Sequence, residues 1–107
     1  MALQNAVQGG RRPSQVIVWA DADGDAVDLT GATITAVLRH RTGAQTSRAS
    51  DGAFVVMDAA AGRFRWDYGA QDVATPGRYE VQFSAAFGTD PTPLRSFAEA
   101  WTVEPYG

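Results

Sequence analysis

The 107-residue sequence predicts an all-β domain, an antiparallel sandwich or barrel of about 6–8 short strands. The clearest sign is the segment 76–88, PGRYEVQFSAAFG, in which apolar and polar residues alternate. This period of two is typical of a strand with one face on a core and one face on water. Similar short segments follow one another between turn residues, and none has helical periodicity beyond one or two turns. The lack of crossover helices excludes a parallel βαβ architecture.

The β-branched residues and the turn residues of the first half of the chain predict two strands and the turn between them. A strand is expected over 15–20, where Val16 to Trp19 are β-branched or aromatic, and an acidic turn over 21–28 contains Gly24. A second strand, from about 32 to 41, would direct four apolar residues to one side: Ala32, Ile34, Ala36 and Leu38. The polar segment 42–50 is expected to be a loop or a weak edge strand.

Strands are also predicted over 54–57 and 63–68, joined by the small-residue turn 58–62. In the second of these, aromatic residues at 64, 66 and 68 alternate with polar residues, which implies a thick core on one side. The opening segment follows, and a last strand is expected over 94–104, with Phe97, Trp101 and Val103 on one face. Glu99 falls on that face too, so we expect a bulge nearby or a position at the rim of the sheet.

Length and composition limit the classes of function. A chain of this size is expected to form one domain, with a core large enough to fold without a metal or a disulfide. The absence of cysteine excludes thiolate metal sites and cysteine nucleophiles. The net charge of −3 gives no reason to expect nucleic acid as a partner. We expect no cofactor and no catalytic role.

The N-terminus is expected to differ from the rest of the chain. Residues 1–13 are small and polar and contain Gly9, Gly10 and Pro13, so we expect a flexible arm followed by a single domain over 14–107. The N-terminal segment has no apolar run long enough for a signal peptide or a membrane span. Synthesis in the cytoplasm, without a membrane partner, is the expectation.

Several carboxylates and the single histidine are candidates for sites of chemistry. Asp21, Asp23 and Asp25 surround Gly24 and suggest a cation loop, although the spacing fails the EF-hand pattern; the alternative is a solvated acidic hairpin turn. His40 lies between two arginines, which disfavour its protonation and repel a cation, so a surface position at a strand end is expected.

Two further groups have both a functional and a structural interpretation. Asp67 and Asp72 could form a glycosidase-like pair, or simply two surface carboxylates near a turn. Trp66, Tyr68 and Trp101 could form a sugar-stacking platform if they faced solvent, but the alternation with Phe64 favours the core.

Arginine is the residue type that most suggests an interface. All nine cationic residues are arginine. Arg63 and Arg65 are expected on the outward face of their strand, and arginine is enriched where proteins dock. Arg11 and Arg12 form a second pair in the arm. Each pair is either an interface anchor or part of a solvated surface.

Three motifs resemble a known family. Asp23-Gly24 with 27–36 (VDLTGATITA) is similar to the start of the N-terminal domain of phage upper baseplate proteins and related virion modules. The segments 61–66 (AGRFRW) and 76–79 (PGRY) resemble the second half of that domain, and Phe97 to Val103 would be its closing strand. The resemblance spans about 15–103. Those proteins continue into a receptor-binding module after the sandwich; here we expect none, so a capsid-surface or neck position is an alternative to the baseplate.

The resemblance implies an Ig-like β-sandwich that docks on other virion proteins, in several symmetric copies. It implies a structural protein of a tailed-phage-like particle, with the virion as its location. It also implies a tyrosine corner, in which the Tyr79 hydroxyl bonds to backbone near Asp72. A carbohydrate-binding β-sandwich for adhesion to a host surface is the alternative, and it requires solvent-facing tryptophans.

Overall fold

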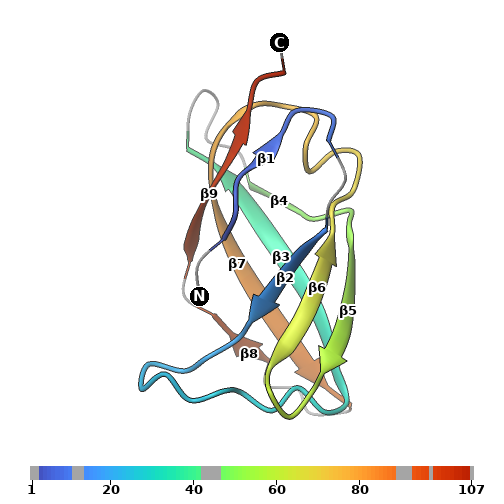
Figure 1. The fold of residues 1–107 in the computed structure, drawn as a ribbon, viewed down its shortest axis with the longest axis vertical. Helices are drawn as coiled ribbons and strands as arrows, with labels where there is room; N and C mark the ends of the chain where they lie inside the picture. The colour runs from blue at the N-terminus through green and yellow to red at the C-terminus, as the bar shows by residue number, and fades with distance from the viewer. Residues whose placement is uncertain (1–2, 11–13, 42–46, 89–92, 97, 107) are drawn as a thin grey trace.

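The computed structural model describes residues 3–10, 14–41, 47–88, 93–96 and 98–106, which form two packed β-sheets (Figure 1). Its strands are β1 (Ala6–Val7), β2 (Gln15–Val18), β3 (Ala32–His40), β4 (Ser47–Ala49), β5 (Ala53–Asp58), β6 (Arg63–Asp67), β7 (Gly77–Phe87), β8 (Leu94–Arg95) and β9 (Glu99–Glu104). No helix occurs in these ranges, and hence none that could cross a membrane. The predicted all-β sandwich class is confirmed.

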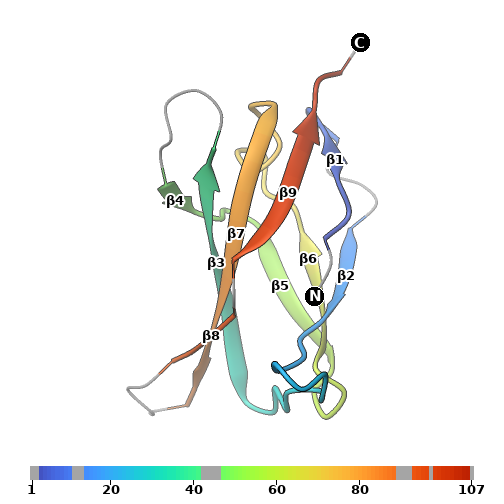
Figure 2. The same ribbon diagram turned by 90° about the vertical axis from the view of Figure 1, so that its left-hand side faces the viewer.

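The larger sheet has the strand order β1-β9-β7-β3-β4, with β8 also paired to β7, and the smaller sheet has the order β2-β6-β5. Turned by 90°, the sandwich shows β3, β7 and β9 in one layer and β2 and β6 in the other (Figure 2). The β3–β7 pair is the longest, running in register from Ala32 opposite Phe87 to His40 opposite Tyr79. The ladder is antiparallel throughout except for β1, which lies parallel to β9.

Aromatic side chains fill the space between the sheets. Trp66 of β6 is fully buried, with its ring centroid 4.8 Å from that of Trp101 and 6.0 Å from those of Phe54 and Phe83. Aromatic pairs at such separations contribute beyond the area that they bury. The predicted inward alternation of β6 is confirmed, as is that of β3, in which Ile34, Ala36 and Leu38 are buried.

The segment Leu29-Thr30-Gly31 closes one end of this core. Asp28 Oδ1 accepts hydrogen bonds from the Thr30 backbone N–H and hydroxyl, at 2.9 and 2.6 Å, which shapes an Asx turn. Leu29 is thereby directed into the core, where it is fully buried. The turn therefore sets the entry of the chain into β3.

The N-terminal segment departs from the expected flexible arm over 1–13. Of the part described, residues 3–10, β1 pairs with β9 and Ala6 joins the core with 6% of its surface exposed. Further hydrogen bonds run from the Gln8 N–H to Glu104 O and from the Gly9 N–H to Val73 O. A short strand forms here because the open edge of β9 offers hydrogen-bond partners to its backbone, which an isolated arm would lack. The glycines follow the end of this strand.

The expected single strand over 94–104 is divided into β8 and β9. Arg95 lies opposite Ser84, and Glu99 lies opposite Val81. The chain therefore advances by four residues from β8 to β9 while β7 advances by three. This extra residue is a bulge, as predicted near Glu99. At the break, the Ser96 hydroxyl accepts the Phe83 N–H at 2.9 Å. Phe97 lies outside the described residues.

Tyr79 ties the start of β7 to the preceding connection. Its hydroxyl donates to the backbone carbonyl of Thr75 at 2.6 Å, three residues beyond the position expected near Asp72. Its ring stacks on His40 at a centroid distance of 4.7 Å. A tyrosine hydroxyl bonded to backbone a few residues upstream has the geometry of a tyrosine corner.

The packing of β1 predicts different effects for two neighbouring residues. Ala6→Asp would place a carboxylate in the core and lower the free energy of unfolding by about 2 kcal/mol or more. Val7→Asp, on the exposed face of the same strand, would change it by about 0.5 kcal/mol or less. Urea denaturation measures both. Equal stability of the two variants would show that β1 is not part of the folded domain in solution.

Removal of the corner hydroxyl gives a second comparison. Tyr79→Phe is expected to reduce stability by about 1 kcal/mol, since a part-buried hydrogen bond to the Thr75 carbonyl is lost. Tyr106→Phe is the control, because Tyr106 is 81% exposed. Thermal unfolding followed by circular dichroism measures the difference, and identical melting temperatures would contradict the role given to the corner.

Candidate functional site

The outward face of the smaller sheet, here called the valine–arginine face, is apolar at four positions. These positions are 40–53% exposed and are Val16, Val18, Val55 and Met57. The two arginines predicted as interface anchors, Arg63 and Arg65, lie on β6 between them. Arg65 is opposite Val16 on one side and Val55 on the other, and Arg63 is opposite Val18. The register therefore assembles one surface from three strands.

The outward face of the larger sheet has a different composition. β3 and β7 carry mostly polar or small residues there: Thr33, Thr35, Val37, Arg39, Arg78, Glu80, Gln82, Ser84 and Ala86. This is the usual pattern for a strand face in water. The contrast indicates that the valine–arginine face is suited to contact with another protein, since arginine and apolar residues are typical of the centres of interfaces.

An ion pair fixes one arginine of this surface. Arg65 Nε and Nη2 donate to the two oxygens of Asp67, at 2.8 and 3.1 Å. Asp67 also accepts a hydrogen bond from the Ser14 hydroxyl at the start of β2. The Ser14 hydroxyl first, and then the Arg65 guanidinium, hold the pKa of Asp67 below its ordinary value. Arg65 is therefore preorganised, whereas Arg63 retains an exposed charge.

Asp58 adds a carboxylate at the margin of the face. It lies opposite Arg63 beyond the bulge at Met57, and its Oδ1 accepts the Ala61 N–H at 3.3 Å. The bulge also distorts β5, which is an edge strand, and irregular edges resist the addition of further strands. The geometry favours contact through the face of the sheet over contact through this edge.

Other predicted residues lie elsewhere. Arg11 and Arg12 are outside the described residues. Trp19, Trp66 and Trp101 are buried, with 3%, 0% and 1% of their surface exposed. They pack in the core, so they do not form the solvent-facing platform that sugar stacking requires. His40 is half-buried at the end of β3, as expected for a strand end.

Asp72, weighed as a partner of Asp67, is fully buried and has a structural role. Its carboxylate accepts hydrogen bonds from Arg48 Nη2 at 2.9 Å, the Ser50 hydroxyl at 2.7 Å and the Gly69 N–H at 2.9 Å. A charge removed from water needs such partners. Sequence reasoning missed this cluster because its members follow no period and belong to the short strand β4 and to separate loops.

The close approach of Gly52 belongs to the same cluster. A Cβ at this position would lie 2.4 Å from the Asp67 carbonyl oxygen and 2.9 Å from Asp72 Oδ2. Only glycine fits there without displacing backbone. The packing fixes the loop that precedes β5 and, with it, one border of the valine–arginine face.

The acidic turn is a tight hairpin. Ala20 and Ala26 form a bridge, and Asp21 Oδ1 accepts the N–H groups of Asp23 and Asp25 at 2.9 and 3.0 Å. Ligand atoms of Asp21, Asp23 and Asp25 lie within 4.8 Å of one another, and all three residues are exposed. These carboxylates could approach a hard cation together, but half of the Asp21 carboxylate already serves the turn, which accounts for the grouping without a metal.

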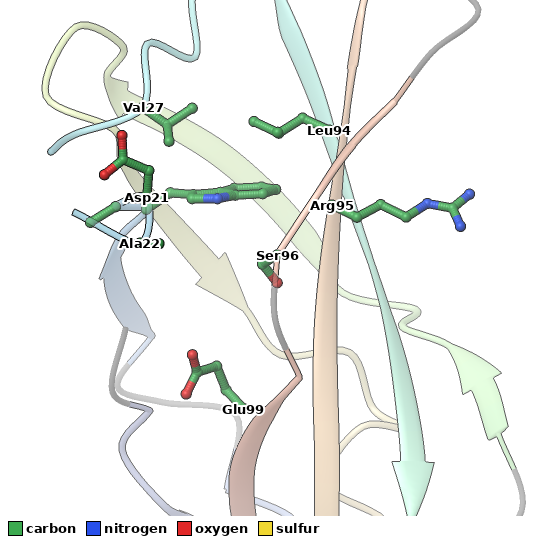
Figure 3. Close-up of a pocket in the computed structure, with 9 residues that line it drawn as sticks. Asp21, Ala22, Val27, Leu94, Arg95, Ser96 and Glu99 are labelled. Carbon is green, nitrogen blue, oxygen red and sulfur yellow. The ribbon is translucent and has the colours of Figure 1, made fainter. Parts of the chain in front are cut away.

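A pocket of about 320 Å³ lies between this turn and β8 (Figure 3). Its lining residues come from the connection that follows β2 and from the β8–β9 part of the larger sheet, and are Trp19, Ala20, Asp21, Ala22, Val27, Leu94, Arg95, Ser96 and Glu99. Figure 3 shows Leu94 directed toward the side of Val27, and the Arg95 guanidinium directed away from the other labelled lining residues. Sequence reasoning found the acidic turn and the bulge separately and gave no sign that they face a shared space.

Comparison with known proteins adds no family assignment. No protein-family model matches the chain, and no curated protein matches its sequence.

The link between Asp67 and Ser14 predicts an acid-sensitive contribution to stability. The pKa of Asp67 is lowered in the folded state, against about 3.9 when unfolded. The contribution of the ionised Asp67 to stability is therefore fully present above pH 4, and it is lost as the pH falls through the pKa of Asp67 in the folded state. Ser14→Ala, which removes the largest cause of the shift, and Asp67→Asn should both flatten the fall in melting temperature between pH 5 and about pH 2.5. If the melting temperature of either variant fell with pH as steeply as that of the unaltered chain, the role given to Asp67 would be contradicted.

Proposed function

We propose that this chain is a non-enzymatic structural protein of a tailed-phage-like particle, which docks on neighbouring virion proteins as a baseplate, tail, neck or capsid-surface component. The valine–arginine face is the docking surface in this proposal. The observation that carries it is the contrast between the two outward sheet faces: one is mostly polar or small apart from Val7 and Val37, and the other has four exposed apolar residues around two arginines. Several symmetric copies in the particle would repeat the contact.

The topology supports an Ig-like module of the kind that the sequence motifs resemble. In Ig nomenclature, β9-β7-β3-β4 has the order G-F-C-C′, and β2-β6-β5 has the order B-E-D. The parallel pairing of β1 with β9 and the Tyr79 corner agree with that scheme. The motif residues Leu29 and Gly31 form the turn that enters β3.

The roles found for the polar residues support a non-enzymatic function. Asp72 has three hydrogen-bond donors, Asp67 is held by Ser14 and Arg65, and His40 stacks on Tyr79. Each of these groups stabilises the fold. The alternative of a carbohydrate-binding module loses its main support, because the tryptophans that would stack on sugar rings are buried.

The docking surface is tested by measuring incorporation into particles. Val55→Asp introduces a carboxylate into the valine–arginine face next to Arg65, and we expect it to reduce the amount of the chain in purified particles by about tenfold or more. Val37→Asp is the matched control, because Val37 is 48% exposed on the other sheet and Val55 is 40% exposed. Quantitative immunoblotting of particles from the organism that encodes the chain measures both variants.

Comparable melting temperatures of the two variants would exclude misfolding as the cause of a difference. Equal incorporation of Val55→Asp and Val37→Asp would overturn the assignment of the docking face. Absence of the unaltered chain from the particles would overturn the virion function itself. The two parts of the proposal therefore fail separately.

A further inference from the structure

The sequence contains two Asp-Gly pairs, Asp23-Gly24 in the acidic turn and Asp51-Gly52 in the loop before β5. In such a pair the aspartate carboxyl group can react with the backbone nitrogen of the glycine, which has no side chain to shield it. Both aspartates are exposed, so access to water does not distinguish them. The contacts around each pair therefore decide which of them has the freedom to react.

Contacts with distant parts of the chain hold Asp51-Gly52 in place. The Asp51 carboxylate accepts the Gln71 N–H at 3.1 Å, and its other oxygen lies 3.8 Å from Arg48 Nη1. The Gly52 backbone packs so closely against the Asp67 carbonyl oxygen that a Cβ would overlap it. Rotation of either residue toward the other would break these contacts, which connect the loop before β5 to the loop after β6.

The protonation of Asp51 also disfavours the reaction. Burial raises the pKa of Asp51, but the Gln71 N–H and further partners outweigh this effect and hold the pKa below its ordinary value. An ionised carboxylate loses an oxygen far less readily than a protonated carboxyl group, since the leaving group must depart as water. The same contacts thus fix the position of the carboxylate and keep it charged.

The hydrogen bonds that the described residues make at Asp23-Gly24 stay within the exposed turn. The Asp23 N–H donates to Asp21 Oδ1 at 2.9 Å, and the Gly24 N–H donates to Asp21 O at 3.0 Å. Within the described part of the chain, no group donates to the Asp23 carboxylate. Gly24 has a φ of 85° and open space where a Cβ would be. The tip of such a turn opens at small cost and without disturbing the core.

We propose that Asp23-Gly24 converts to an isoaspartyl linkage in the folded protein, whereas Asp51-Gly52 keeps its ordinary peptide bond. The Gly24 nitrogen attacks the carbon of the protonated Asp23 carboxyl group. A C–N bond forms, and the carboxyl hydroxyl leaves as water with the proton of the N–H group. Water then adds to the α-carbonyl carbon of the succinimide ring, and the bond from this carbon to nitrogen breaks as the nitrogen regains its proton. The water lost first is regained, so no other reagent is needed.

The product lengthens the main chain of the acidic turn by one carbon atom. This change falls between Asp21 and Asp25, whose backbone groups close the turn. The residues of the core lie outside it, so we expect the domain to stay folded. The reaction requires only water and this turn, and it is therefore independent of the proposed virion function.

The test uses the full chain, incubated for several weeks at neutral pH with and without denaturing urea. The two pairs fall in different tryptic peptides, so mass spectrometry with electron-transfer fragmentation quantifies isoaspartate at each. In the folded protein we expect at least about tenfold more isoaspartate at Asp23 than at Asp51. In urea, where neither pair is held, the two amounts should agree within about twofold. Equal amounts in the folded protein, or a difference that persists in urea, would overturn the proposal.

The same substitution at each pair provides matched variants. Asp23→Glu keeps the charge but would have to close a six-membered ring, which forms much more slowly, so most of the isoaspartate of the folded protein should be lost. Asp51→Glu should leave the total unchanged. Enzymatic methylation of isoaspartyl carboxylates measures the total, and melting temperatures show that both variants are folded. An unchanged total in Asp23→Glu, or an equal decrease in both variants, would contradict the assignment to Asp23.

Discussion

The alternation of β6 is the constraint on which the rest of this structure depends. Phe64 and Trp66 must face inward because they form the centre of the aromatic core, and this leaves Arg63 and Arg65 outward. A slip of one residue would reverse every side chain of the strand and bury both arginines, at a cost far above the stability of a small domain. Since β6 is the middle strand of its sheet, its register also fixes which residues of β2 and β5 accompany the arginines on the outer face.

Much of the fold could be predicted from the sequence because period-two patterns are local. The strands over 32–41, 63–68 and 76–88 were expected nearly as they occur, since each alternates between a core face and a water face. Strand β1 could not be predicted in this way. A strand of two residues is too short to show a period-two pattern, and its pairing depends on the open edge of β9, almost 100 residues later in the chain. The division of the last strand was indicated only by the position of Glu99 on an apolar face.

The candidate site was predictable only in part, because a sheet face is assembled by pairing between strands. The outward positions of Arg63 and Arg65 follow from their own strand. The four aliphatic neighbours belong to β2 and β5, where runs of apolar residues hide which side is exposed. The pairing of Val16 and Val55 with Arg65 resolves that ambiguity. The Asp72 cluster and the pocket have no local pattern at all, since each combines residues of loops and short strand segments that are distant in the sequence.

The same bulge that divides the last strand also explains why a pocket exists at this end of the sandwich. Glu99 lies opposite Val81 and alternates with Trp101 on the inward face of β9, where full burial of a carboxylate would be costly. The extra residue breaks the ladder between Arg95 and Glu99, so that Glu99 is the first residue of β9 and lies half-buried among the pocket residues. The opposite wall comes from the acidic turn, in the connection that leads from the smaller sheet to the larger one. The pocket therefore forms only when the two sheets have packed, and a partly folded chain would present neither of its two walls in place.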